Sequence, residues 1–198
     1  MALSVRLYLV LLAAVATGRF VELAISRRHQ QRLAGHGVRK VDEPHFRWMV
    51  ALHTGVLVGA AVEVVWLDRP LIPWLAATMG VVFAGANLTR WWVIRTLGTY
   101  WNVAVMDSSR LGIVTKGPYR VVRHPNYTAV FAEMVALPLI HTAWITAAAG
   151  TMAHLWVLSR RVAVEDELLM ANPAYRAAMG HKPRFIPSLR GVRRDGSD

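Results

Sequence analysis

Residues 115–127 carry the side chains of this chain that are best suited to binding a charged organic molecule. Cationic and aromatic side chains crowd the segment directly before an apolar run, and they include Tyr119, Arg120, Arg123, His124 and Tyr127. Guanidinium groups bind carboxylates and phosphates, and tyrosines offer aromatic faces with hydroxyl donors. Such a segment indicates a site where an anionic or nucleotide-like ligand meets a membrane.

A helix is predicted to begin directly after the histidine of this segment. Pro125 fixes its own φ and suits the first helical turn, and it pushes His124 out of helical geometry. We expect a helix from Asn126, with its free N–H groups and positive dipole end facing the His124 region. That end attracts a carboxylate. The alternative is a basic anchor beside the membrane that binds lipid phosphates.

Composition indicates apolar spans joined by basic loops. The 198 residues are one domain's worth of chain and are 55% hydrophobic, with a mean hydropathy of +0.33, yet the formal net charge is +11. Soluble domains rarely combine these properties, whereas membrane proteins with basic loops do. No helix-turn-helix, zinc-finger or RNA-binding signature accompanies the charge, so we predict no nucleic-acid partner.

Two kinds of site are absent from the pattern. The chain has no cysteine, which excludes disulfides, thiolate nucleophiles and thiolate metal ligands. Its eight histidines are scattered without an HExxH or similar spacing, so we predict no metal.

Five apolar runs predict a single all-α membrane domain over residues 1–198, with a cytosolic tail over 165–198. The predicted spans are 3–25, 48–67, 71–94, 127–140 and 143–164. A cleaved signal peptide is the alternative for the first run, but the run is long and contains Arg19 and Glu22. The last two runs form a helical hairpin, whose first arm is short for a full crossing.

The distribution of basic residues predicts the orientation. Nineteen of the 23 Lys and Arg residues fall in the 26–47 loop, the 95–126 loop and the region from Arg160 onward. By the positive-inside rule, the N-terminus lies outside and the C-terminus lies in the cytosol. We expect the chain to reside in the plasma or inner membrane.

Polar residues within the spans gather at one depth under this topology. The group near the cytosolic leaflet comprises Arg19, Glu22, Asn87, Arg90 and Glu133. Because polar groups are costly in a bilayer, such a cluster indicates a site, although snorkelling and interhelical pairing explain single members. Arg19 and Glu22 have the spacing of a helical pair. We interpret Glu133 as functional. Glu63 lies toward the outer side, and we interpret it as structural.

A second charged group continues the last helix into the cytosol. Arg161 and Glu165 have the i, i+4 spacing of a surface pair, and Asp166 follows. These acids could receive the ammonium or ribose hydroxyls of a bound cofactor. A solvated helix end is the ordinary alternative.

Four segments together closely resemble the isoprenylcysteine carboxyl methyltransferase family. They are Gly117–Tyr127, Arg161–Leu169, Asn172–Tyr175 and Pro183–Pro187. The N-terminal half resembles the bacterial branch that methylates alkylresorcinols and alkylpyrones. That resemblance rests on Arg19–Leu23, Ser26–Arg28, Met49–His53, Arg90–Gly98 and Trp101–Asn102.

The resemblance implies S-adenosylmethionine bound in a cytosolic pocket without a Rossmann domain, and the chain indeed has no GxGxxG. The cofactor-binding residues that it implies are Tyr119, Arg123, His124, Tyr127, Glu165 and, on weaker grounds, Trp101 beside Asn102. Family members more often have glutamate at the second acid, so we weight Glu165 above Asp166. Arg184 near the site and Glu133 are the catalytic candidates.

The implied reaction is methyl transfer to an oxygen of an amphiphilic lipid. The favoured acceptors are an alkylresorcinol or alkylpyrone hydroxyl and an isoprenylcysteine carboxylate, and the sequence leaves a phosphatidylethanolamine-type amine open as well. A phenol or enol must lose a proton, which Glu133 or His124 could take. An NADPH-dependent sterol-type reductase is the alternative, because such enzymes share an Arg-His-Pro-Asn-Tyr segment. The third possibility is a non-catalytic protein that binds membrane lipids. The sequence leaves the oligomeric state open.

Overall fold

The computed structural model describes residues 1–38, 40–41, 46–106 and 111–187. Within those ranges the chain is helical and contains no strand, which confirms the predicted all-α class. Its elements are α1 (Leu3–Ala34), α2 (Phe46–Trp66), α3 (Pro73–Leu97), η1 (Gly98–Tyr100), η2 (Gly117–Arg120), α4 (Pro125–Leu139), α5 (Trp144–Ala171) and α6 (Pro173–Met179). Arg39, Asp42, Glu43 and Arg110 of the predicted basic loops, and the tail from residue 188, lie outside the described residues.

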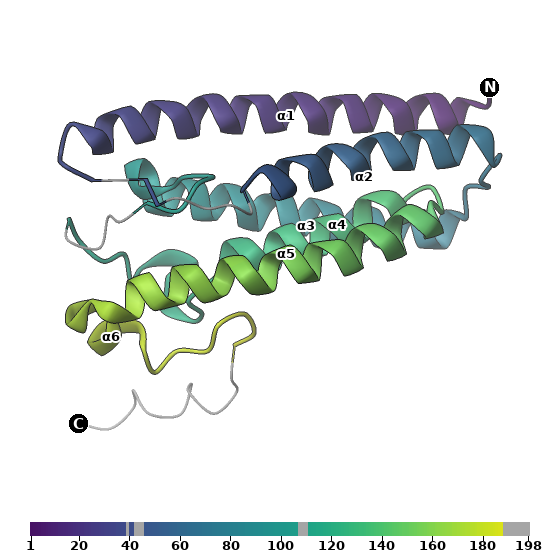
Figure 1. Ribbon diagram of the computed structural model, residues 1–198. Helices are drawn as coiled ribbons and strands as arrows, with labels where there is room; N and C mark the ends of the chain where they lie inside the picture. The colour runs from purple at the N-terminus through teal and green to yellow at the C-terminus, as the bar shows by residue number, and fades with distance from the viewer. Residues whose placement is uncertain (39, 42–45, 107–110, 188–198) are drawn as a thin grey trace.

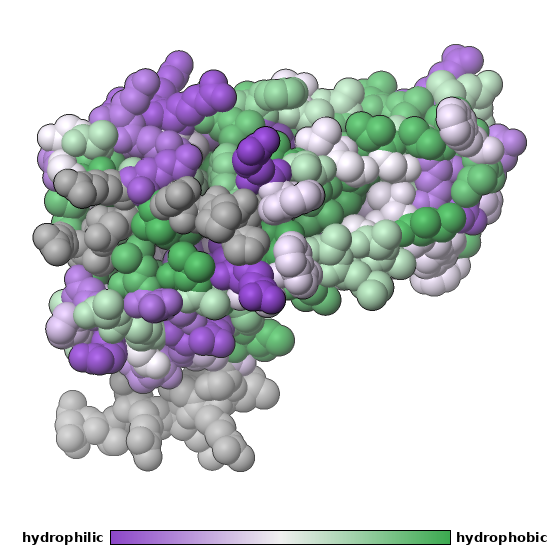
Figure 2. Space-filling view, in the orientation of Figure 1, coloured by the Kyte–Doolittle hydropathy of each residue, from purple (hydrophilic) through white to green (hydrophobic). Residues whose placement is uncertain are grey.

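Five long helices lie along a common direction, and the short α6 lies at one end of them (Figure 1). Helix α4 packs against both α3 and α5, and α2 packs on α5. We call the end that holds the last turn of α1, residues 98–106 and 111–124, and α6 the loop end. The opposite end, with the N-terminus and the α2–α3 and α4–α5 connections, is the far end. Hydrophilic residues gather at the loop end, and apolar residues cover much of the face between the two ends (Figure 2).

Each predicted apolar run lies within a helix apart from one or two residues at its ends, but two helices continue well beyond their runs. Helix α1 continues to Ala34 and α5 to Ala171, because Arg, Gln, Glu and Leu are good helix formers whether or not lipid surrounds them. Helices α1 and α2 are long and apolar enough to cross a membrane. The count of five spans and the orientation stay predictions.

Glu63 fixes the start of α5 at the far end. Helix α5 has no capping side chain of its own at Ala143. The Glu63 carboxylate accepts hydrogen bonds from the backbone N–H of Ile145 at 3.0 Å and of Thr146 at 2.7 Å, and from the Thr146 hydroxyl at 2.8 Å. It also pairs with Arg69 at 2.9 Å. A carboxylate on α2 therefore caps α5, and its interpretation as a structural residue is confirmed.

The predicted helix start at the loop end is also confirmed, within one residue. Helix α4 begins at Pro125, with His124 in a non-helical conformation (φ −125°, ψ 58°). The backbone N–H groups of Arg123 and His124 donate to the carbonyls of Pro183 at 2.9 Å and Arg184 at 2.8 Å. The segment that follows α6 therefore holds the start of α4 in place.

Candidate active site

A cavity of about 370 Å³ opens among the helices on the side of the loop end. Its size falls in the range of small-molecule sites, roughly 300–1,000 Å³. One part of its wall is polar and comes from the loop end: Tyr119, Arg123, His124, Asn126, Tyr127, Glu165 and Tyr175. The other part lies further along α1, α2, α3 and α5 and mixes apolar side chains with Arg19, Glu22, His53, Arg90 and His154. We call these parts the polar half and the inner half of the cavity.

Asp166 organises the segment before α4. Its carboxylate accepts a hydrogen bond from Nε2 of His124 at 2.7 Å, and it pairs with Arg123 at 3.3 Å and with Arg184 at 2.6 Å. Burial by itself would raise the pKa of Asp166, but these three donors together lower it below its ordinary value. Asp166 is therefore an anion that fixes the His124 ring, and it is not among the residues of the cavity wall.

Glu165, the neighbouring acid, faces the cavity and joins α5 to α4. Its carboxylate accepts a short hydrogen bond from the hydroxyl of Tyr127. The same hydroxyl accepts a bond from Nε of Arg161 at 2.8 Å, and Arg161 also donates to the carbonyl of Val103. Neighbouring residues in a helix point about 100° apart, so the two acids take different roles. The greater weight given to Glu165 agrees with this geometry.

Two tyrosines face the polar half as hydroxyl donors. Burial raises the pKa of Tyr175 to about 12 and raises the pKa of Tyr119 well above its ordinary range, so both phenols keep their protons. Tyr175 stands on α6, where the side chain of Asn172 caps the helix by accepting from the N–H groups of Ala174 and Tyr175. Sequence reasoning noted the Asn172–Tyr175 motif but missed this helix and gave Tyr175 no role.

Several buried polar atoms around the polar half make no hydrogen bond within the described part of the chain. They are the indole nitrogen of Trp101, Nε of Arg123 and Oδ1 of Asn126. All three residues border the cavity, and Trp101 is only 2% exposed. A buried donor or acceptor without a partner costs free energy, so these atoms are suited to a polar ligand.

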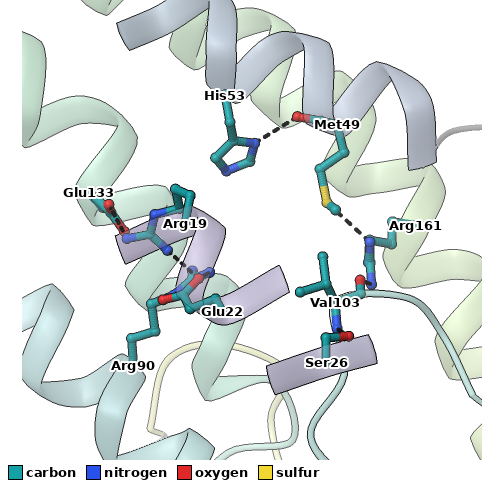
Figure 3. A network of polar contacts seen from close by, with 9 residues as sticks. All are labelled: Arg19, Glu22, Ser26, Met49, His53, Arg90, Val103, Glu133 and Arg161. Carbon is teal, nitrogen blue, oxygen red and sulfur yellow. Dashed lines mark hydrogen bonds and ion pairs between the residues drawn. The ribbon is translucent and has the colours of Figure 1, made fainter. Parts of the chain in front are cut away.

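An ion-pair network of four residues from three helices lies at the inner half, and three of its members border the cavity (Figure 3). Glu22 pairs with Arg19 at 2.7 Å and with Arg90 at 2.5 Å. Arg19 also pairs with Glu133 of α4 at 2.6 Å. The predicted Arg19–Glu22 pair and the gathering of these charges are confirmed, whereas the side chain of Asn87 bonds the Phe83 carbonyl of its own helix.

The structure brings most of the predicted site residues to one cavity. Tyr119, Arg123, His124, Tyr127, Glu165 and Trp101 all border it. The two catalytic candidates do not: Glu133 is held by Arg19, and Arg184 lies on Asp166 with a side chain that is 55% exposed. Their catalytic roles stay predictions. His53 and Arg161, which border the cavity, were not assigned roles, although both lie in segments that carried the family resemblance.

Within the described residues the chain is all-α, two of its helices are long and apolar enough to cross a membrane, and its cavity is polar at one end and apolar along its helices. These features are consistent with a membrane protein. The model of the isoprenylcysteine carboxyl methyltransferase (ICMT) family matches residues 76–171, so the resemblance drawn from the sequence is confirmed. The match supports a membrane methyltransferase as the general activity.

Two relatives match over most of their length. The chain is 26% identical over 163 residues to the uncharacterized protein YpbQ of Bacillus subtilis strain 168. This alignment covers 82% of this chain and 96% of YpbQ. It is 25% identical over 159 residues to an uncharacterized protein of Haemophilus influenzae strain ATCC 51907. This second alignment covers 79% of this chain and 91% of that protein. Both matches extend well beyond the segment that the family model matches.

Proposed function

We propose that the chain transfers the methyl group of S-adenosylmethionine to an oxygen of a lipid at the cytosolic surface of the membrane. The observation that carries this proposal is that one cavity joins His124 and Glu165 at the loop end to a helix-lined inner half. A polar cofactor and a lipid acceptor can meet there while the cofactor stays in polar surroundings and the alkyl chain of the acceptor stays in apolar surroundings.

The polar half fits the cofactor by its donor set. Arg123 and the positive dipole end of α4 suit a carboxylate, and Glu165 suits an ammonium or ribose hydroxyls. Trp101, Tyr119 and Tyr175 offer aromatic faces, and the unpartnered nitrogens of Trp101 and Arg123 would gain partners. When bound, S-adenosylmethionine supplies a methyl group that is already activated on a sulfonium.

The chain itself has to position the acceptor and exclude water. The Tyr127, Glu165 and Arg161 contacts tie α4, α5 and the 101–106 segment into one rigid wall. Correct placement of two reactants lowers a barrier by about 7–11 kcal/mol, so this wall accounts for much of the catalysis. Burial of the inner half keeps water from the acceptor oxygen.

The inner half suits the alkyl chain of the acceptor. Its apolar wall includes Phe20, Leu23, Leu57, Val130 and Leu158. Each methylene buried there contributes about 0.8 kcal/mol. The acceptor class that we propose is an alkylresorcinol or alkylpyrone hydroxyl, with an isoprenylcysteine carboxylate as the second candidate.

Calorimetry with purified full-length protein tests the cofactor. We expect S-adenosylhomocysteine to bind and NADPH not to bind, and the reverse result would favour the sterol-type reductase. His124→Ala and Glu165→Ala should abolish binding, while retained affinity in both variants would favour a lipid-binding protein without catalysis. Mass spectrometry of lipid extracts incubated with methyl-labelled S-adenosylmethionine then identifies the acceptor.

A further inference from the structure

His53 presents a proton-accepting nitrogen to the inner half of the cavity. Nδ1 of His53 lies 2.8 Å from the backbone carbonyl of Met49, one helical turn earlier. A carbonyl oxygen can only accept, so Nδ1 carries the proton and, in the neutral ring, Nε2 has a free lone pair. His53 borders the cavity, and its ring points into the open space between Arg19 and Arg161 (Figure 3).

Four charged groups from α1, α3 and α4 surround His53 and balance one another, and the Arg161 guanidinium of α5 borders the same cavity. Arg19 and Glu22 stand on α1, Arg90 on α3 and Glu133 on α4, while the ring of His154 on α5 lies 5.9 Å away. The two carboxylates are held by the two guanidinium groups. Neither carboxylate is therefore free to take a proton, and Arg19 and Arg90 lie where they would stabilise a negative oxygen.

His53 also lies next to the polar half. The sulfur of Met49 lies 3.0 Å from a guanidinium nitrogen of Arg161, and Arg161 bonds the Tyr127 hydroxyl at 2.8 Å. One helical turn, about 5.4 Å, separates Met49 from His53. The imidazole is therefore close to the boundary between the two halves of the cavity.

We propose that Nε2 of His53 takes the proton from the hydroxyl of the lipid acceptor, an inference that rests on the proposed function. The O–H bond breaks and an N–H bond forms at Nε2. The electron pair stays on the acceptor oxygen, which becomes the nucleophile, and the imidazole becomes an imidazolium. The proton then leaves to water. Arg19 and Arg90 stabilise the charged oxygen.

The other two candidate bases are less suited to this step. Glu133 is paired with Arg19 and lies outside the wall of the large cavity. His124 is fixed by Asp166 and stands among the groups assigned to the cofactor. His53 stands instead beside Thr54, Leu57 and the other helix positions that suit the acceptor.

The first test varies the acidity of the acceptor. Purified full-length protein is assayed on long-chain alkylphenols whose ring substituents make the hydroxyl progressively more acidic, ending with an alkyl nitrophenol that is ionised at the assay pH. General-base catalysis contributes about 10²–10⁴-fold, so His53→Gln should lose that factor in kcat/KM on the least acidic phenol and little on the ionised one. An equal loss on every phenol, or no loss, would overturn the proposal.

A second test needs no methyl transfer. The visible absorbance of the alkyl nitrophenol reports its ionised fraction when it is bound together with S-adenosylhomocysteine. At a pH below the pKa of the free nitrophenol, wild-type protein should hold more of it as phenolate than His53→Gln does. His141→Gln is the matched control, because His141 is also buried, at 1% exposure, but lies outside the cavity wall. Equal ionised fractions in all three proteins would contradict the proposal.

Cofactor binding separates this inference from the proposed function. If wild-type protein fails to bind S-adenosylhomocysteine, the methyltransferase proposal itself fails. If it binds and methylates phenols, and His53→Gln behaves like wild type on every acceptor, only the role of His53 fails. Methylation of carboxylates alone would likewise overturn the role of His53 while the methyltransferase stands.

Discussion

Glu63 at the far end and Glu165 at the loop end are both carboxylates within helices, but their surroundings differ. Glu63 is 6% exposed, and both of its oxygens are used by backbone N–H groups, a hydroxyl and Arg69. Glu165 accepts a bond from Tyr127 and borders a cavity. The first carboxylate completes the fold, and the second is placed to receive a ligand.

The comparison teaches that burial of a charge does not by itself mark a functional site. A buried charge is tolerated when its hydrogen bonds are complete, and Glu63 meets that condition. At the loop end, buried atoms of Trp101, Arg123 and Asn126 lack partners within the described residues. Incomplete hydrogen bonding beside a cavity is therefore the better sign of a ligand site.

The largest effect should come from Glu63→Ala, and it should fall on stability. Loss of the α5 cap and of the charged hydrogen bonds should lower the free energy of unfolding by about 3 kcal/mol. Thermal unfolding in detergent measures this loss. Glu167→Ala, at an exposed position of α5, is the control and should change little. Weakened S-adenosylhomocysteine binding in folded Glu63→Ala protein would show that Glu63 also serves binding, and would contradict the division between a structural far end and a ligand-binding loop end.

Glu165→Gln should instead lower ligand affinity and leave stability nearly unchanged. A charge-assisted hydrogen bond contributes about 1.5–3 kcal/mol, so the affinity for S-adenosylhomocysteine should fall roughly 10- to 150-fold. The unfolding temperature should stay near that of the wild type, because the amide can still accept from Tyr127. Calorimetry on Glu165→Gln and the exposed-site control Glu167→Gln makes the comparison. A large loss of stability with unchanged affinity would show that Glu165 is structural like Glu63.

A smaller, pH-dependent effect should come from Asp166. The pKa of Asp166 in the folded chain lies below its ordinary value of 3.8, so the stabilisation is fully present above that pH and is lost as the pH falls through the folded value. The 55% exposed side chain of Arg184 limits the size of this term through solvent screening. Unfolding temperatures of wild type and Asp166→Asn should differ at pH 6 and converge at acid pH. If the two unfolding temperatures differ by the same amount at every pH, the ionisation of Asp166 is not the source of the pH-dependent stability.

Local sequence rules predicted those features that depend on near neighbours. Pro125 restricts His124 and starts α4, and the spacing of Arg19 and Glu22 allows their pair within one helix. The end of α1 was predicted too early, at residue 25 and not at Ala34, because loss of apolar character marks where lipid ends and not where a helix ends. The continuation of α5 beyond its apolar run was predicted and is confirmed. The α6 start was signalled by Asn172 and Pro173, a capping residue followed by proline at the first helical position.

Features that depend on which helix faces meet could not be predicted. The Arg19–Glu133 pair joins residues 114 positions apart, and nothing local indicates that α1 and α4 face each other there. For the same reason Glu133 looked like an unpaired charge in the sequence. The contrast between Glu165 and Asp166 likewise depends on how α5 is rotated against α4, which tertiary packing decides.

The smallest effect that we predict concerns Tyr8 at the far end. Its hydroxyl donates to the Leu137 carbonyl at 3.0 Å, and its ring packs on His141 with 5.2 Å between the ring centres. Tyr8→Phe keeps the ring and removes the hydrogen bond, so the free energy of unfolding should fall by about 1 kcal/mol. Thr17→Val removes an exposed hydroxyl bond from the same helix and should cost less. Because the far end serves the fold alone, S-adenosylhomocysteine affinity should be unchanged in both variants, and an altered affinity in Tyr8→Phe would show that the two ends are coupled.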